Sequence, residues 1–192
     1  LLEKSGVDRV LAMDLHSAQI QGYFDIPCDH IYGSPVLIDY LETLKLKEVV
    51  VVSPDVGGVA RARAFAKLMN DAPLAIIDKR RSAHNIAESL TVIGEVKGKT
   101  AILIDDMIDT GGTICSGANL LKKEGAKRIF ACASHAVFSP PSYERLSAKD
   151  LFEQVIVTNS IPVIDNGNFS QLKVLSVANM LGEAIWRIHE ES

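Results

Sequence analysis

The stretch from Ala101 to Thr113 places the strongest constraint on how this chain can fold. It starts with a short apolar run, rich in β-branched residues, which predicts a buried strand of a parallel sheet. Asp105 and Asp106 follow where this strand should end, and open α/β sheets bind their ligands at that edge. The chain then turns through Gly111 and Gly112 into a helical pattern. This order of features predicts a ligand site at the end of a parallel strand.

The turn after the acidic pair is suited to a phosphate group. Small residues between Asp109 and Thr113 let backbone N–H groups point at an anion, and the N-terminus of the following helix adds partial positive charge. A phosphate held beside two carboxylates suggests a phosphorylated polyol, such as a sugar phosphate. The spacing is neither that of a P-loop nor that of the dinucleotide-binding glycine fingerprint. The alternative interpretation is a buried strand that ends in a glycine turn with two solvated acids.

Composition limits the class of protein. With 192 residues, 47% apolar residues and a net charge of −4, the chain allows one large globular domain, or one domain and part of another. It has no basic run interleaved with aromatic residues, which argues against a nucleic-acid partner. The longest apolar runs are strand-sized, so we expect no membrane-spanning segment. The three cysteines are far apart and lack metal-ligand spacing, which indicates a reducing compartment.

Two further strand ends carry residues that could bind a divalent ion. The segment 9–15 reads as a strand, and its period of two places Asp14 and His16 on one face at its end. A carboxylate beside an imidazole can bind such an ion. A second buried strand ends in the acid-and-glycine turn 53–58, which contains Asp55. Both ends are expected at the edge of the sheet that carries the acidic pair.

Basic residues follow two of the predicted strands. Three consecutive basic residues, 79–81, leave the strand 74–78 and begin a polar stretch without periodicity, which we interpret as a mobile loop near the site. The alternative is a basic turn on the surface. The helix after the turn 53–58 carries Arg61 and Arg63, which we interpret as part of a solvated face.

Strand and helix patterns alternate along the whole chain, which predicts a doubly wound, mainly parallel α/β sheet. A boundary between two α/β domains fits near 29–33. The first residue is a leucine within an apparent helix, so we expect a piece of a longer chain. Helical patterns cover 35–46, 59–69, 112–124, 140–148 and 177–190, and strand patterns cover 9–15, 49–52, 74–78, 91–96, 101–104, 128–134, 154–159 and 173–176.

Four motifs resemble, in order and spacing, those of the ribose-phosphate diphosphokinases, or phosphoribosyl pyrophosphate synthetases. They are Asp-Leu-His-Ser-Ala-Gln-Ile-Gln-Gly at 14–22, Ser-Pro-Asp-Val-Gly-Gly at 53–58, Asp-Lys-Arg-Arg at 78–81, and the acidic and glycine-rich stretch 105–113. The last motif alone resembles the phosphoribosyl-binding motif of type I phosphoribosyltransferases. The resemblance covers essentially the whole chain and matches the second half of the family's proteins.

The resemblance implies two domains with a type I phosphoribosyltransferase-like α/β fold. Residues 1–29 would be the end of a first domain whose start is missing, and residues 30–192 would form the second domain. The closing helix, 177–190, would pack back on the first domain. A homo-oligomer, a hexamer built from dimers, is the family's habit, and we expect a cytoplasmic protein or one of an organellar stroma or matrix.

The family's reaction moves the β,γ-diphosphoryl group of ATP onto the C1 hydroxyl of ribose 5-phosphate and yields phosphoribosyl pyrophosphate and AMP. The resemblance therefore implies ATP and ribose 5-phosphate as partners and Mg²⁺ as cofactor. Asp105, with Asp106 beside it, would hold the ribose hydroxyls directly or through magnesium. The 5-phosphate would be held by Asp109, Thr110, Gly111, Gly112 and Thr113.

The same resemblance implies metal-binding and catalytic residues elsewhere in the chain. His16 and Asp55 match the family's magnesium positions near the ATP phosphates, and Asp14 would contribute indirectly. Lys79 and Arg81 match the catalytic loop. Loop closure would bring these two cations over the transferring phosphates while excluding water.

Two departures keep other functions open. The basic motif continues as Ser-Ala-His-Asn over 82–85, where the family often has Pro-Arg-Pro-Asn, and the glycine loop reads Thr-Gly-Gly-Thr, where many members have Ala or Cys after the first Thr. The alternatives are a catalytically silent, synthetase-associated regulatory subunit and a phosphoribosyltransferase that consumes phosphoribosyl pyrophosphate. The presence of His16, Asp55, Lys79 and Arg81 argues against a silent subunit.

Overall fold

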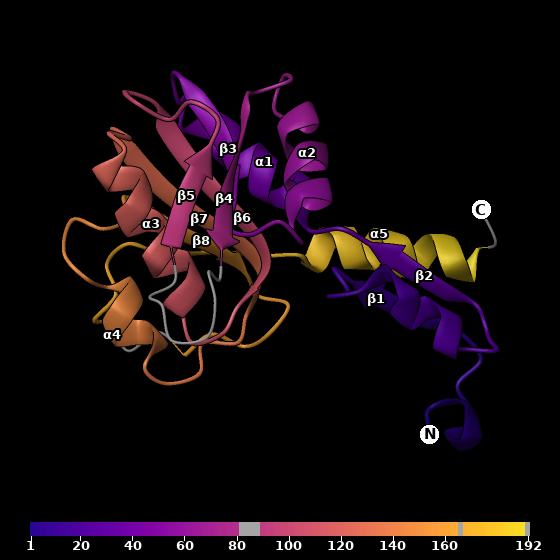
Figure 1. Ribbon diagram of the computed structural model, residues 1–192. Coiled ribbons are helices and arrows are strands. Elements are labelled where there is room, and N and C mark those ends of the chain that lie inside the picture. The colour runs from indigo at the N-terminus through magenta and orange to yellow at the C-terminus, as the bar shows by residue number, and fades with distance from the viewer. Residues whose placement is uncertain (81–88, 165–166, 191–192) are drawn as a thin grey trace.

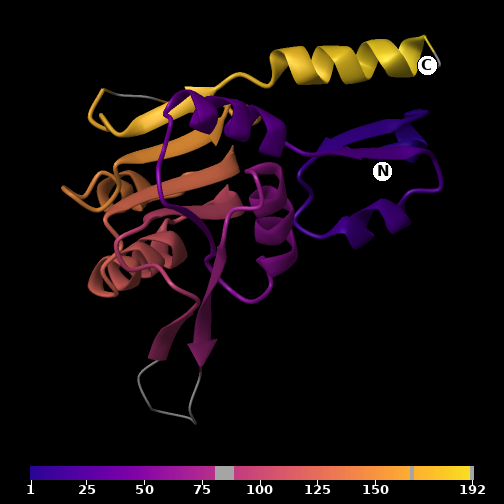
Figure 2. The ribbon, with the colours of Figure 1, turned by 90° about the horizontal axis from the view of Figure 1, so that it is seen from above.

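The computed structural model describes residues 1–80, 89–164 and 167–190, which form two parts (Figures 1 and 2). The larger part, which we call the body, is a seven-stranded sheet with helices on both faces. The smaller part, the arm, contains the paired strands β1 (Val10–Met13) and β2 (Cys28–Ile31) and the last helix, α5 (Ala178–His189). Segments from the two ends of the chain therefore lie on the same side of the body.

The body sheet is doubly wound and mainly parallel, as the sequence predicts. Its strands lie in the order β5-β4-β3-β6-β7-β8-β9, and every neighbouring pair is parallel except β4 and β5. The chain enters at β3, adds β4 and β5 on one side, and returns to β6 on the other. The winding reverses between β3 and β6, and ligands bind at this point in open α/β sheets. The strands are β3 (Val49–Ser53), β4 (Leu74–Arg80), β5 (Ser89–Ile93), β6 (Thr100–Ile108), β7 (Arg128–Ala136), β8 (Gln154–Thr158) and β9 (Leu172–Leu175).

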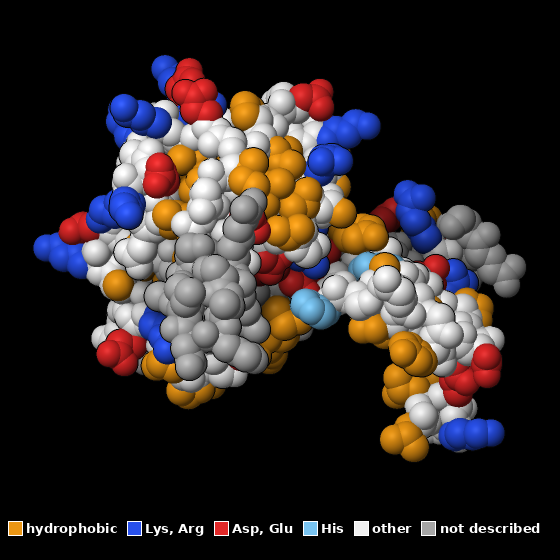
Figure 3. All heavy atoms as spheres, viewed as in Figure 1, with side chains coloured by type: hydrophobic (Ala, Val, Ile, Leu, Met, Phe, Trp, Pro, Cys, Tyr) orange, Lys and Arg blue, Asp and Glu red, His pale blue; other side chains and the backbone are white. Residues whose placement is uncertain are grey.

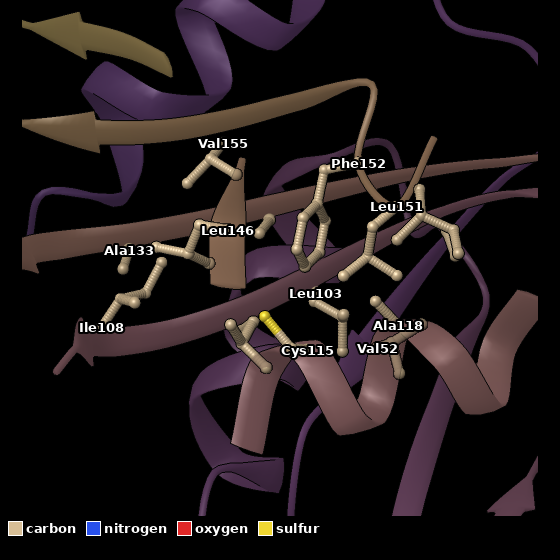
Figure 4. Packing of buried hydrophobic residues seen from close by; sticks show 14 of the residues in the cluster. Val52, Leu103, Ile108, Cys115, Ala118, Ala133, Leu146, Leu151, Phe152 and Val155 are labelled. Atoms are coloured by element: carbon tan, nitrogen blue, oxygen red, sulfur yellow. The ribbon is translucent and has the colours of Figure 1, made fainter. Parts of the chain in front are cut away.

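Two apolar clusters hold the helices to the two faces of this sheet. Ile102 and Leu103 are neighbours on β6, are both fully buried, and belong to different clusters because successive side chains of a strand point to opposite faces. Figure 4 shows Leu103 packed with Cys115 of α3. Burial on both faces explains the continuous apolar run in the sequence. The helices of the body are α1 (Ser34–Thr43) and α2 (Val59–Leu68) on one face, and α3 (Gly112–Lys123) and α4 (Ser142–Leu146) on the other.

The arm is the part of the structure that differs most from what the sequence predicts. The 3₁₀ helix η2 (Ala18–Tyr23) and the strand β2 are not among the elements that the sequence patterns predict. The residues of β2 are Cys-Asp-His-Ile, which show no apolar run and no clear alternation. Another 3₁₀ helix, η1 (Glu3–Ser5), lies near the start of the chain and has Gly6 as its C-cap. No helix within the described ranges is long and apolar enough to cross a membrane.

Candidate functional site

Asp55, Asp105 and Asp106 gather at the edge of the sheet where β3 ends, although β6 continues through the acidic pair to Ile108 instead of ending before it as expected. Val52 of β3 pairs with Leu103 of β6, so the turn that contains Asp55 leaves the sheet at the level of Asp105 and Asp106. The glycine-rich loop follows directly after β6 and leads into α3. Figure 3 shows acidic side chains and a histidine at the surface between the body and the arm. The site therefore lies at the reversal point of the sheet and faces the arm.

The loop 109–113 surrounds a hollow of about 240 Å³. Gly111 has a φ of 74°, and a Cβ there would lie 3.3 Å from Leu146 Cγ, so both its conformation and its surroundings favour glycine. Because α3 begins at Gly112, the first backbone N–H groups of that helix have no carbonyl partner within it. The loop thus presents N–H donors and a helix N-terminus to the hollow, which suits an anion.

Arg145 of α4 also belongs to the site, although none of the sequence motifs contains it. Its Nη1 donates a hydrogen bond to Thr110 O at 3.1 Å, and the same atom lies 3.5 Å from the position of a Cβ on Gly112. The guanidinium therefore stabilises the loop through its hydrogen bond to Thr110 and adds positive charge beside the hollow. Because Arg145 is more than thirty residues further along the chain, only the fold brings it to the loop.

The acidic pair is strongly constrained by neighbouring polar groups. Asp106 is buried, and its two oxygens have different partners: Oδ2 lies 2.8 Å from His16 Nδ1, and Oδ1 lies 3.3 Å from Arg61 Nη1. Asp105 Oδ1 lies 3.1 Å from the same Arg61 Nη1 and accepts a hydrogen bond of 2.9 Å from the backbone N–H of Asp106. Four residues from three separate segments thus form one connected group.

These contacts shift the pKa values of the two carboxyl groups in opposite directions. Burial raises the pKa of Asp105 to about 7, and the neighbouring carboxylate of Asp106 adds to the increase. Burial also raises the pKa of Asp106, but the hydrogen bonds from Asp105 and His16 and the charge of Arg61 outweigh it, so this pKa lies below its ordinary value. The pair titrates as a unit in which Asp106 keeps its negative charge while Asp105 gains or loses a proton near neutral pH.

Arg61 corrects one expectation from the sequence. It was interpreted as part of a solvated face, but its side chain is only 24% exposed and binds both carboxylates of the pair. Arg63, two residues later, is exposed as expected. Arg61 lies in the first turn of α2, directly after the turn that contains Asp55, and this position at the carboxyl edge of the sheet was the available signal.

Asp14 and His16 have different surroundings although they are two residues apart. His16 is exposed and reaches Asp106, whereas Asp14 is buried at the junction between the arm and the body. Asp14 Oδ2 accepts hydrogen bonds from the backbone N–H of Gly33, at 2.7 Å, and from Ser134 Oγ of β7. His135 Nε2 lies 3.1 Å from Asp14 O, which adds a second link between β1 and β7. Asp14 therefore fixes the segment that carries His16.

Asp55 is exposed at the same edge, and its Oδ1 accepts a hydrogen bond of 2.8 Å from the backbone N–H of Gly58. Within residues 1–80, 89–164 and 167–190, no three His, Cys, Asp or Glu side chains form a metal-binding group, so His16, Asp55 and Asp14 are not assembled around one point. Lys79 lies in β4, paired with Leu90 of β5, and these two strands extend beyond the rest of the sheet (Figure 2). Arg81 lies outside the described residues.

Residues 79–192 match the model of the phosphoribosyl synthetase-associated domain. The chain belongs to this family. It is 96% identical over 192 residues to a ribose-phosphate pyrophosphokinase of Prochlorococcus marinus and covers 58% of that protein. It is 62% identical over 193 residues to ribose-phosphate pyrophosphokinase 1 of Spinacia oleracea, of which it covers 57%. The chain thus spans somewhat more than half the length of these relatives.

A solved structure shows the same fold. The phosphoribosylpyrophosphate synthetase of Mycobacterium smegmatis is 43% identical to this chain and superimposes with a TM-score of 0.91. The match covers 100% of this chain and 62% of that one, so it includes the arm as well as the body. The resemblance to ribose-phosphate diphosphokinases that the four motifs carry is therefore confirmed.

Proposed function

We propose that this chain is the larger part of a ribose-phosphate diphosphokinase, which transfers the diphosphoryl group of ATP to the C1 hydroxyl of ribose 5-phosphate. The products are phosphoribosyl pyrophosphate and AMP. The observation that carries the proposal is the glycine-rich hollow directly beside a constrained acidic pair, at the point where the sheet reverses. The names of the similar proteins support the same reaction.

The two halves of the sugar phosphate match the two parts of the site. In this proposal the 5-phosphate binds in the hollow, where it receives backbone N–H groups and the positive end of α3. The ribose hydroxyls then face Asp105 and Asp106, which accept their hydrogen bonds directly or through magnesium. The residues proposed for the phosphate are Asp109, Thr110, Gly111, Gly112 and Thr113, which line the hollow.

The carboxylate of Asp55 at this edge suits Mg²⁺, which prefers oxygen ligands and keeps several waters. Asp55 is exposed there, and His16 is held at the edge by Asp106. We propose that His16 and Asp55 hold magnesium beside the ATP phosphates and that Asp14 contributes by fixing the segment of His16. Bound magnesium would neutralise negative charge on the phosphate oxygens.

Lys79 and Arg81 are the proposed catalytic residues. Diphosphoryl transfer depends mainly on positioning and on stabilising charge at the transferring oxygens. Lys79 lies near the end of β4, and Arg81 follows that strand in the sequence. We expect Lys79→Ala and Arg81→Ala each to lower turnover by at least roughly 10²-fold, the usual effect of removing one charge-stabilising donor. Lys123→Ala, at an exposed position of α3, is the matched control and should leave turnover unchanged.

We propose further that residues 1–29 end a first domain whose start precedes Leu1 and that residues 30–192 form the second domain. The absence of any buried residue in β1 and β2, in contrast to the buried strands β6 and β7, supports this division. Because β2 ends at Ile31, the change of domain comes just after that strand. By the same resemblance we propose a homo-oligomer, a hexamer built from dimers, in the cytoplasm.

The test is AMP release from ATP, Mg²⁺ and ribose 5-phosphate. It compares this chain with a longer one, the extended chain, which carries at its N-terminus the preceding residues of the 96% identical Prochlorococcus protein. Activity of the extended chain supports the proposal. If neither chain releases AMP but both bind ribose 5-phosphate, a regulatory subunit is the better conclusion. If the extended chain instead consumes phosphoribosyl pyrophosphate together with a base, it is a phosphoribosyltransferase.

A further inference from the structure

We infer that Arg61 is a positioning residue for the sugar phosphate, which acts by holding the carboxylates of Asp105 and Asp106 in their binding orientation. The inference rests on the proposed function. It starts from one contact: Arg61 Nη1 lies 3.1 Å from Asp105 Oδ1 and 3.3 Å from Asp106 Oδ1. One guanidinium therefore sets the separation and the direction of both acidic side chains.

The contact is built into the fold rather than made by a mobile surface side chain. Arg61 is in the first turn of α2, and Asp55 Oδ1 accepts a hydrogen bond from the backbone N–H of Gly58 at the start of that helix. Gly58 is buried, and a Cβ there would lie 2.9 Å from Ser53 Oγ and 3.9 Å from Arg61 Nη1. The absence of a side chain at Gly58 lets β3 and the arginine approach closely. The end of β3, the start of α2 and the end of β6 thus form one unit.

Arg61 also reduces the repulsion between the negative charges of the site. Two adjacent carboxylates repel each other and repel an incoming phosphate, and the low polarity of a half-buried site strengthens both effects. A guanidinium offers several N–H donors in a rigid plane and remains charged at all relevant pH values. By binding Oδ1 of each carboxylate, Arg61 reduces this repulsion and fixes the direction in which Asp105 presents its Oδ2 to the ribose hydroxyls, while Asp106 Oδ2 contacts His16.

Asp106 connects this unit to the other side of the site. Its Oδ1 faces Arg61 and its Oδ2 faces His16, so the orientation imposed by Arg61 also affects where His16 lies. Because Arg61 contacts both members of the pair but His16 only through Asp106, its loss should weaken sugar-phosphate binding more than ATP binding.

The experiment compares Arg61→Gln, Arg61→Lys and Arg63→Gln in the extended chain. Arg63 is the matched control because it lies on the same helix and is exposed. We expect Arg61→Gln to raise the KM for ribose 5-phosphate roughly 10- to 100-fold, by analogy with the loss of a residue that orients a metal ligand. The KM for ATP should change clearly less. Arg61→Lys should recover part of the loss, and Arg63→Gln should behave like the unchanged protein.

Calorimetric titration of each variant with ribose 5-phosphate gives a second reading that does not need turnover. Absence of AMP release by the unchanged extended chain contradicts the proposed function alone, and the titration then still tests Arg61. Equal effects of Arg61→Gln and Arg63→Gln, or equal losses for both substrates, overturn the inference. A circular dichroism melting curve identifies a variant that fails to fold. If Arg61→Gln fails to fold, Arg61→Lys carries the test, because its ammonium group can still bind a carboxylate. Its affinity for ribose 5-phosphate should then fall in the same direction, but by less.

Discussion

The body and the arm differ in how completely their strands and helices are buried. Strands β6 and β7 of the body are almost completely buried, whereas every residue of β1 and β2 is only partly buried. Helix α5 has a clear apolar side, but none of its residues is buried, and Ile185 and Trp186 are exposed. A hollow of about 550 Å³ is lined by residues of β1, β2 and α5. An apolar sequence pattern therefore identifies the face of a helix or strand that can be buried, but it does not identify the element against which that face packs.

The two parts also differ in how they are held. The body is held by apolar contacts between the sheet and its helices, as Figure 4 shows for one face. The junction of the arm with the body relies on polar contacts, in which Asp14 binds Gly33 and Ser134, and His135 binds the carbonyl groups of Met13 and Asp14. Since His16 belongs to the arm side of this junction, the geometry of the candidate site depends on these few hydrogen bonds.

The largest expected difference between the two parts concerns aromatic residues. Phe130 of β7 is 1% exposed and packs in the cluster beneath α1 and α2. Phe130→Ala should lower the free energy of unfolding by about 3–5 kcal/mol, because it removes a buried ring and leaves a cavity. Trp186→Ala, at a residue of α5 that is 56% exposed, should change it by less than about 0.5 kcal/mol. Urea unfolding followed by circular dichroism measures both values.

Similar losses from the two substitutions would show that the arm is packed as firmly as the body, and the comparison would fail. Phe130→Leu is the matched control within the body, since it keeps an apolar side chain and should cost less than Phe130→Ala. A loss confined to Phe130→Ala would support the difference in packing.

The junction should show an intermediate effect. Asp14→Ala removes the acceptor for the Gly33 N–H and the Ser134 hydroxyl, and burying these donors without partners costs about 1–3 kcal/mol. Asp14 also has a φ of 41°, a left-handed conformation that Asn tolerates better than Ala, so Asp14→Asn should lose less stability. Asp25→Ala, at an exposed carboxylate of the arm, is the matched control.

The single tryptophan of the chain, Trp186, lies in the arm and gives a direct reading of this junction. If Asp14 holds the arm to the body, Asp14→Ala should lower the fluorescence anisotropy of Trp186 relative to Asp25→Ala. An unchanged anisotropy together with an unchanged free energy of unfolding would contradict the assignment of Asp14 to the junction.

The sequence was sufficient for the body because burial on both faces leaves a clear signal. The runs before Asp105 and before Ser53 are continuously apolar, and each is followed by glycine and a helical pattern, so strand, turn and helix could be placed in order. The same reasoning failed for β2, because every residue of this strand is partly exposed and two of them, Asp29 and His30, are polar. A partly covered strand has no continuous apolar run, and its pairing with β1 depends on tertiary structure.

The site was predictable where its residues follow strands and not where they come from helices. Asp105, Asp106 and the glycine loop could be placed together because the carboxyl ends of parallel strands meet at one edge. Arg61 and Arg145 reach the same edge from α2 and α4, and an arginine on a helix has the same sequence pattern whether it faces solvent or a carboxylate. Their partners are distant in the sequence, so only the packing of the helices identifies them.

The smallest expected effect comes from two ion pairs on the surface, one in the arm and one in the body, and it should be the same in both parts. Arg9 and Asp29 in the arm form a two-pronged ion pair, with Nε–Oδ2 at 2.6 Å and Nη2–Oδ1 at 3.0 Å. Arg128 and Glu153 in the body form the same arrangement, with Nε–Oε2 at 2.7 Å and Nη2–Oε1 at 2.6 Å. Hydrogen bonds from the arginines hold the pKa of Asp29 and that of Glu153 below their ordinary values. Both pairs are partly exposed, with side-chain exposures between 35% and 45%, so solvent screens them to a similar degree.

A carboxyl group with a lowered pKa stabilises the folded state above its ordinary pKa, and this contribution is lost as the pH falls through the lowered value. Arg9→Gln should therefore raise the pKa of Asp29, and Arg128→Gln that of Glu153, and each variant should lose the small stability that its pair provides at neutral pH. Carboxyl carbon shifts measured by NMR between pH 2 and pH 6 would give both pKa values. Equal shifts would show that the arm differs from the body in apolar cover and not in surface electrostatics. A clearly larger shift at Glu153 would mean that the environment of the body strengthens even its exposed ion pairs, and the comparison would then extend from packing to charge.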